Sequence, residues 1–169
     1  SAKPKARSGA MTSRDGLVLS KVQGMIEQVT GCIEGFRFNT AISSLIVFTD
    51  ELQRYSKDPH REVWDQAMKS LILLLSPFTP HISEELWEAR GGKGFVSLQK
   101  WPKADEKLID RRLEMMETFV SNVKADIENI LKIVNKKPQR IAIYTSPGWK
   151  HTAVKEILSA VETPNEIVP

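Results

Sequence analysis

The chain has 169 residues, of which 41% are hydrophobic and 27% are charged, and its net charge is +3. This composition is typical of a folded globular protein and excludes a largely disordered one. The sequence contains no apolar run near the ~20 residues that a membrane-spanning helix needs, and no signal-peptide-like start. Its single cysteine, Cys32, excludes an internal disulfide and fits a reducing compartment. We therefore expect a cytoplasmic protein without membrane contact, long enough for one domain and part of a second.

The N-terminal third of the sequence predicts a leader and two helices. Residues 1–15 carry four basic side chains and little to bury, so we expect a disordered leader, native or added by cloning. Apolar residues at helical spacing then predict one helix over 17–36 and a second over 39–55, with Asn39 as the N-cap of the second. A third helix is predicted to start at Asp58-Pro59, a capping carboxylate followed by proline.

The most distinctive stretch is an aliphatic run over 71–75, where the third helix ends. A helix that is apolar all round has to be enclosed by other elements, so we expect this run at the centre of the core. Two prolines follow and predict a rigid corner, because each disfavours the α region for the residue before it. Thr79-Pro80 then starts a fourth helix that ends at Gly91-Gly92. A loop with one short extended piece, Phe95–Leu98, leads onward.

A fifth, long helix is predicted from near Asp105, and it carries the clearest periodicity in the chain. Its apolar residues are spaced alternately four and three apart over nearly four heptads. They are Ile109, Leu113, Met116, Val120, Val123, Ile127, Ile130 and Val134. The spacing is compatible with a long helix lying along the bundle. It is also compatible with a helix that pairs with a second copy, which would make the chain a helical protein–protein interaction module.

The periodicity changes after Lys136-Lys137-Pro138. Arg140–Thr145 has strand composition, a turn follows over 146–148, and 152–161 predicts a short helix. A lone strand is not stable, so we expect the incomplete start of a small α/β unit. The predicted fold class is therefore mainly α, a bundle of about five helices followed by the start of a small α/β unit. The predicted segments are a leader over 1–15, the bundle over 16–137 and the α/β unit over 138–169.

Few residues suggest catalysis. His81 lies three and four positions before Glu84 and Glu85, so one helical turn can present all three to a metal. A catalytic zinc needs three protein ligands, and neither HExxH nor HxxEH occurs, so we expect a helix-start histidine beside exposed glutamates. The glycine-rich segment 91–94 lacks the GxxxxGK[ST] spacing of a phosphate-binding loop and predicts a turn. We expect no catalytic, metal-binding or cofactor-binding residue in this chain.

The distribution of charge gives the clearest indication of function. Six basic residues and no acidic one occur between Leu131 and Lys155, with Tyr144 and Trp149 interleaved. Cations contact phosphate groups and aromatic rings offer stacking surfaces for bases, so this pattern is typical of an RNA-contact segment. A solvated basic helix end is the alternative. The candidate RNA-binding residues are Lys132, Lys136, Lys137, Arg140, Trp149 and Lys150.

Four segments of the sequence resemble class Ia aminoacyl-tRNA synthetases. Leu73–Trp87 (LLLSPFTPHISEELW) is similar to the signature of their anticodon-binding helical bundle, and Phe36–Ile42 (FRFNTAI) to the start of its second helix. The Thr-Ala-Ile ending favours the leucyl family; the equivalent bundle of the valyl or isoleucyl family is the alternative. Ser97–Asp105 resembles the Trp-Pro segment after the bundle. Ile141–Lys150 resembles the start of the C-terminal domain of archaeal and eukaryotic-cytosolic leucyl-tRNA synthetases.

The resemblance implies a parent enzyme, a leucine–tRNA ligase that uses ATP and Mg²⁺ to attach leucine to its tRNA. It also implies that this part is a non-catalytic tRNA-binding fragment, inactive alone, because the ATP-site motifs HIGH and KMSKS and the editing domain have no counterpart here. No cofactor is expected in the fragment itself. The implied partners are leucine-specific tRNA and the remaining domains of the same synthetase, and we expect a monomer.

Overall fold

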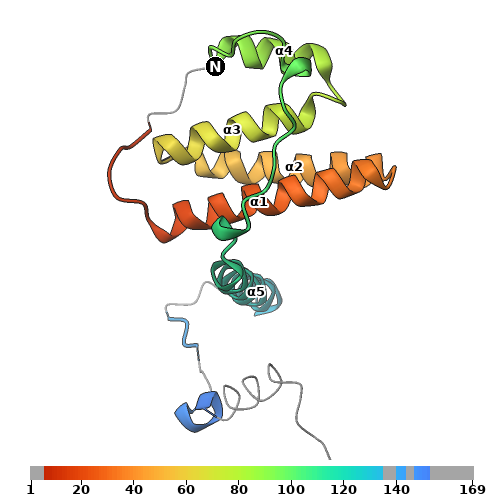
Figure 1. Ribbon diagram of the computed structural model, residues 1–169. Helices are drawn as coiled ribbons and strands as arrows, with labels where there is room; N and C mark the ends of the chain where they lie inside the picture. The colour runs from red at the N-terminus through yellow and green to blue at the C-terminus, as the bar shows by residue number, and fades with distance from the viewer. Residues whose placement is uncertain (1–5, 135–139, 144–146, 153–169) are drawn as a thin grey trace, which may run out of the picture. The chain divides into compact units, whose positions relative to one another are not determined.

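A computed structural model gives the structure of the chain over residues 6–134, 140–143 and 147–152 (Figure 1). The α-helices are α1 (Ser13–Glu34), α2 (Phe38–Tyr55), α3 (Arg61–Leu75), α4 (Pro80–Ala89) and α5 (Arg111–Val134), and two short 3-10 turns are η1 (Val96–Leu98) and η2 (Glu106–Leu108). No strand forms within these residues, so the predicted mainly α fold class is confirmed. The chain divides into two compact units, residues 1–124 and 125–169, which are described in turn.

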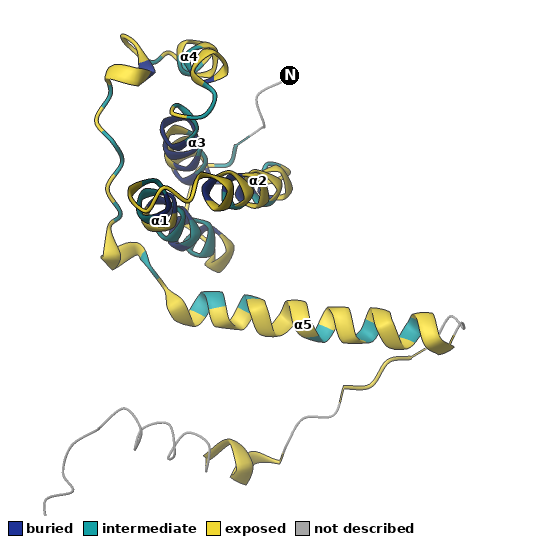
Figure 2. Ribbon diagram, turned by 90° about the vertical axis from the view of Figure 1, so that its right-hand side faces the viewer, coloured by how far each residue is buried: buried dark blue, intermediate teal, exposed yellow. Residues whose placement is uncertain are grey.

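Three helices, α1, α2 and α3, lie side by side and enclose the core of the first unit (Figures 1 and 2). Each turns its buried face toward the other two, as the dark blue ribbon surfaces in Figure 2 show. Val22 of α1, Leu45 of α2 and Leu74 of α3 belong to one apolar cluster. Cys32 is buried in the same cluster. The amphipathic spacing read from the sequence therefore places the core where these three helices meet.

The aliphatic run at the end of α3 is enclosed on both sides. Leu71 and Leu74 face the cluster formed with α1 and α2. The two residues between them pack instead with Val96 of η1 and with Trp87 of α4. Residues 71–74 are all buried, and burying four such side chains stabilises the fold by about 6–12 kcal/mol at most. The predicted central position of this run is confirmed, and a second layer of loop and helix explains why it is apolar all round.

A corner forms between α3 and α4, but only one of the two prolines acts as predicted. Thr79, before Pro80, lies outside the α region at φ −134° and ψ 65°. Ser76, before Pro77, keeps an α conformation at φ −55° and ψ −34°, so the prediction is wrong there. α3 ends at Leu75, and α4 begins with Pro80 at its first position. The carbonyl oxygen of Thr79 accepts the first helical hydrogen bond of α4 from the backbone N–H of Ser83, at 3.0 Å. Proline fits this position because its missing N–H would have no intrahelical partner there.

The N-terminal segment differs from the expected disordered leader over 1–15. α1 already begins at Ser13, and residues 7–12, the N-terminal strap, hold defined backbone contacts in the first unit. The backbone N–H of Arg7 donates to the carbonyl of Pro59 at 2.9 Å, and the N–H of Arg61 donates to the carbonyl of Arg7 at 3.0 Å. These partners lie more than fifty positions away along the chain, where local composition gives no sign of them.

Several helix and loop boundaries also shift from their predicted places. α3 begins at Arg61 with His60 as its N-cap, so Asp58-Pro59 precedes the helix and Asp58 does not cap it. α2 begins at Phe38 with Arg37 as its N-cap, so Asn39 lies inside the helix. Asp105 starts only the short turn η2, where its carboxylate accepts the N–H of Lys107 at 3.0 Å. The long helix starts later, because Asp110 caps it by accepting the N–H of Leu113, again at 3.0 Å. The expected extended piece over 95–98 is the 3-10 turn η1.

The long helix α5 has no buried residue, although its periodicity matches a buried seam. Its first turns are joined to α1 by polar contacts in the first unit: Ser20 donates to the Glu114 carboxylate at 2.6 Å, and the Lys21 ammonium lies 2.5 Å from Glu117. Met116 and Val120 of the seam remain 56% and 48% exposed. Contact with the bundle is therefore limited to the start of the helix in this unit.

In the second unit, residues 140–143 form no strand, and 148–152 are helical. The prediction of a strand over Arg140–Thr145 is wrong for the four residues described. A lone strand is not stable, and no strand forms elsewhere in the described part of the chain to pair with it. The rest of that segment and most of the predicted helix over 152–161 lie outside the described residues. The proposed boundary between 137 and 138 stays a prediction. None of the helices described here is long and apolar enough to cross a membrane.

Candidate nucleic-acid interface

Four of the six predicted RNA-binding residues can be placed. Lys132 is exposed in the last turn of α5, and Arg140 is exposed in irregular chain. Trp149 and Lys150 lie on the helical turn over 148–152, and 68% of the Trp149 surface is exposed. Lys136 and Lys137 lie outside the described residues. Each placed side chain is thus accessible, as contact with a large polyanion requires.

Trp149 and Lys150 are brought together. The Lys150 ammonium lies 5.5 Å from the centroid of the Trp149 ring, within the range of a cation–π contact. The backbone N–H of Lys150 donates to the carbonyl of Pro147 at 3.0 Å, which fixes the start of this turn. An indole face and an ammonium group are therefore presented side by side, one suited to stacking on a base and the other to a phosphate oxygen.

Few cations among the described residues are paired with a carboxylate. In the first unit, Arg7 is paired with Asp15, Lys21 with Glu51 and Glu117, and Arg90 with Asp65. Across the described parts of 125–152, by contrast, no carboxylate pairs with Lys132, Arg140 or Lys150. The first unit also holds exposed lysines that have no carboxylate partner in the described part of the chain, such as Lys69 and Lys93. The segment 131–155 differs in that it contains no acidic residue. Its cations can bind phosphate without first giving up an internal partner.

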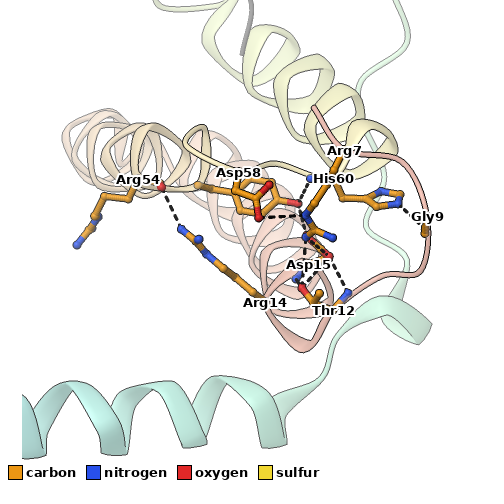
Figure 3. A network of polar contacts seen from close by, with 9 residues as sticks. Arg7, Gly9, Thr12, Arg14, Asp15, Arg54, Asp58 and His60 are labelled. Atoms are coloured by element: carbon orange, nitrogen blue, oxygen red, sulfur yellow. Dashed lines mark hydrogen bonds and ion pairs between the residues drawn. The ribbon is translucent and has the colours of Figure 1, made fainter. Parts of the chain in front are cut away.

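Sequence reasoning missed a polar cluster around Asp15, drawn in Figure 3. The Asp15 carboxylate is fully buried and accepts hydrogen bonds from Arg7 Nη2 at 2.7 and 2.6 Å, and from the Tyr55 hydroxyl at 2.5 Å. The backbone N–H and the hydroxyl of Thr12 donate to it at 2.7 and 2.8 Å. Thr12 and Asp15 form a capping box at the start of α1, and the spacing T-x-x-D was a readable signal for it.

The cluster sets the protonation of its two acids. Burial alone would raise the pKa of Asp15, but hydrogen bonds from Tyr55, Thr12 and Arg7 outweigh burial and hold that pKa well below its usual range. Burial and the hydrogen bond to Asp15 raise the pKa of Tyr55 to about 12. The Tyr55 oxygen also accepts the backbone N–H of His60 at 2.9 Å. Because the oxygens of Asp15 and Tyr55 are already engaged by protein donors, this cluster fastens the N-terminal strap and is not a binding site.

Glu84, one of the two glutamates that follow His81, has a local role. Glu84 accepts hydrogen bonds from the backbone N–H groups of Val96 and Ser97 at 2.7 and 3.2 Å, and from the Ser97 hydroxyl at 3.0 Å. The bond from Val96 is the largest cause of the lowered pKa of Glu84. Over the part of the chain that the structure describes, no three histidine, cysteine or acidic side chains gather as metal ligands. Glu84 therefore holds η1 against α4.

Comparison with known proteins decides the family. A family model described as the anticodon-binding domain of tRNA ligase matches residues 15–144, from the buried Asp15 to the segment after α5. The chain belongs to this family. The kinship with leucyl-tRNA synthetases expected from the sequence is also confirmed, because the relatives given next are leucine–tRNA ligases.

This anticodon-binding domain is 32% identical over 149 residues to the leucine–tRNA ligase of Methanothrix thermoacetophila, which covers 88% of the chain and 16% of that ligase. It is 35% identical over 147 residues to the leucine–tRNA ligase of Pyrococcus abyssi, which covers 80% and 15%. For Methanocaldococcus jannaschii the identity is 33% over 145 residues, covering 85% and 15%. The chain thus spans about one-sixth of the length of the curated relatives that it matches.

A solved structure is similar as well. It is the crystal structure of the ternary complex of Agrobacterium radiobacter K84 agnB2 LeuRS with tRNA and LeuAMS. The TM-score is 0.53 at 32% sequence identity, over 59% of this chain and 12% of that one. Membership of the anticodon-binding domain family does not favour the alternative of a module that pairs through its long helix.

Proposed function

We propose that this anticodon-binding domain is the non-catalytic, tRNA-binding part of a leucine–tRNA ligase, and that its RNA is leucine-specific tRNA. The observation that carries the proposal is the acid-free basic segment, in which Lys132, Arg140 and Lys150 are exposed without a carboxylate partner. Phosphate contacts release counterions and supply affinity that does not depend on sequence. The exposed ring of Trp149 adds a surface on which a base can stack.

We assign tRNA binding to this domain and the chemical steps to other parts of the ligase, because this chain represents only a small share of the length of its relatives. Leucine activation with ATP and Mg²⁺, and transfer to tRNA, belong to the parts of the ligase outside the matched one-sixth. The domain alone then has no aminoacylation activity. It acts as a monomer in the cytoplasm, together with the remaining domains of the same polypeptide.

The experiment separates tRNA binding from chemistry in the complete ligase. Four cations of the basic segment are replaced by glutamine: Lys136, Lys137, Arg140 and Lys150. The KM for tRNA at physiological salt should rise, because phosphate contacts are lost, while leucine-dependent ATP–pyrophosphate exchange stays nearly unchanged.

A matched control removes the same number of charges from exposed lysines of the first unit. These are Lys69, Lys93, Lys100 and Lys103, also replaced by glutamine. The control should leave the KM for tRNA near that of the unmodified ligase. Loss of exchange activity without a change in the KM for tRNA, or an equal rise in KM from the control, would contradict the proposal.

A further inference from the structure

The outer side of α2 is exposed to solvent yet carries no charge over 38–49, a stretch of twelve residues. Three apolar side chains spaced four apart form a stripe along it: Phe38 is 43%, Ile42 is 40% and Ile46 is 59% exposed. Residues at this spacing lie on one ridge of a helix. Val47, next to the stripe, is 60% exposed. The adjacent side of α2 fills the core with Leu45 and Phe48, so the stripe extends the apolar surface of the helix beyond its buried face.

Two hydroxyl groups next to the stripe are bonded within α2. The hydroxyl of Ser43 donates to the carbonyl of Asn39 at 2.9 Å, and the hydroxyl of Thr49 donates to the carbonyl of Leu45 at 2.7 Å. Removing water from a hydroxyl that already donates to its own helix costs less free energy than removing water from one that is bonded only to solvent. The face is therefore apolar and uncharged, and little opposes its dehydration.

An aromatic group stands at the N-terminal end of the stripe. Phe36 is 81% exposed, and its φ of +54° places it in the left-handed region, which an L residue adopts at a cost. The Phe36 ring meets Phe38 edge-on at 6.0 Å between centroids, and Phe38 meets Phe78 edge-on at 6.3 Å. This left-handed residue ends α1, because the backbone N–H of Arg37 donates to the carbonyl of Cys32 at 2.7 Å across it. The turn leaves the Phe36 ring exposed beside the stripe.

The charge of this face decides the kind of partner. RNA presents a polyanionic surface, and the surfaces that bind it are polar and strongly positive. Two basic residues flank the uncharged stretch 38–49: Arg37, the exposed N-cap beside the aromatic group, and Arg54 in the last turn of α2. Between them the stripe itself carries no charge. An uncharged apolar ridge is suited instead to the apolar ridge or groove of another protein element.

We propose that the stripe of α2, with Phe36 at its end, is where this domain docks onto another region of the ligase polypeptide. The inference rests on the proposed function, because the occupant comes from the five-sixths or so of the relatives' length that lies outside this chain. Leu45 and Phe48 fix the buried side of α2 to the core, so docking leaves the helix in place and covers only its outer side.

Thiol labelling tests this docking without using tRNA. Cys32, the single cysteine, is buried and stays unreactive, so Ile46→Cys places one reporter on the stripe. Ile82→Cys on α4 is the matched control, because Ile82 is 58% exposed against 59% for Ile46. Labelling of each site is followed by peptide mass spectrometry, in the 169-residue chain and in the complete ligase. Far-ultraviolet circular dichroism of each variant chain checks that it is folded.

The Ile46→Cys site should be labelled in the complete ligase at least about tenfold more slowly than in the chain, while the Ile82→Cys site changes much less. Equal rates for Ile46→Cys in both proteins would overturn the proposal. So would protection that needs added tRNA, which would assign the face to RNA. Slow labelling of the Ile46→Cys site in the 169-residue chain by itself would also overturn the proposal. If that labelling became slower as the chain concentration rose, a second copy of the chain would be the occupant. Binding of tRNA to the same samples reports the proposed function separately.

Discussion

Replacing Asp15 with asparagine should lower the free energy of unfolding by about 3 kcal/mol. Asparagine fits the space but brings no charge, and its NH₂ group would face the hydrogen-bond donors around Asp15. Arg7 therefore loses its buried counter-charge and keeps only the exposed Asp58. Removing one partner of a buried ion pair costs about 3–5 kcal/mol. Because 28% of the Arg7 side chain is still exposed, water recovers part of that loss, and the lower end of the range is expected.

The assay is urea unfolding of the chain followed by circular dichroism, and its control is Asp58→Asn. Asp58 lies 3.3 Å from the same Arg7 guanidinium, but 68% of its side chain is exposed. An exposed pair contributes about 0.2–1 kcal/mol, so the control should lose no more than that. For a chain of this length, about 3 kcal/mol corresponds to a fall in Tm of about 6–12 °C. Equal losses from the two substitutions would refute the reasoning, since burial is the feature that separates them.

Two further predictions concern pH and packing. The pKa of Asp15 is lower in the folded than in the unfolded chain. The stability that its charge contributes is therefore complete above about pH 4 and is lost as the pH falls further. In unfolding experiments at a series of pH values, Asp15→Asn should reduce the loss of stability at acid pH. Tyr55 affects stability at alkaline pH, because its pKa is raised to about 12 in the folded chain. The stability that it contributes is complete below about pH 10 and is lost as the pH rises toward about 12. Tyr55→Phe should abolish this loss at alkaline pH. At Gly92 an added Cβ would come within 2.3 Å of the Trp87 ring, so Gly92→Ala should destabilise the chain by about 1–3 kcal/mol in the same urea assay. Gly24→Ala, in open space within α1, should instead be stabilising by about 0.5–1 kcal/mol, and a loss there as large as at Gly92 would contradict the steric explanation.

The parts of the fold that the sequence predicted correctly are those set by local chemistry. The start of α4 follows from Pro80, whose ring keeps Thr79 out of the α region. At Pro77 the rule was wrong, because the last hydrogen bonds of α3 hold Ser76 in an α conformation. The aliphatic run over 71–75 is apolar on every side of its helix, so its burial could be predicted without knowing which elements would cover it. The N-terminal strap could not be predicted in this way, because Arg7 is held by Pro59 and Arg61, and composition near Arg7 resembles a disordered leader.

For the candidate interface, the sequence predicted which residues are exposed cations but not how their side chains are arranged. The lack of acidic residues over 131–155 predicts unpaired cations, and the structure leaves Lys132, Arg140 and Lys150 without carboxylate partners. The contact between Lys150 and the Trp149 ring depends on a helical turn that starts earlier than the sequence pattern indicates. The outer face of α2 was missed because Ile42 matches the helical period of the core, while its position in the folded helix leaves it 40% exposed.

The central claim is that the basic segment holds tRNA through its phosphates, and salt dependence of binding tests it most directly. Affinity of the chain for leucine-specific tRNA is measured across a series of salt concentrations, together with the fourfold glutamine variant at Lys136, Lys137, Arg140 and Lys150. Each phosphate contact contributes about 0.9 to the slope of log affinity against log salt, so the variant should lose about 3–4 from that slope. An unchanged slope with undiminished affinity would contradict the account.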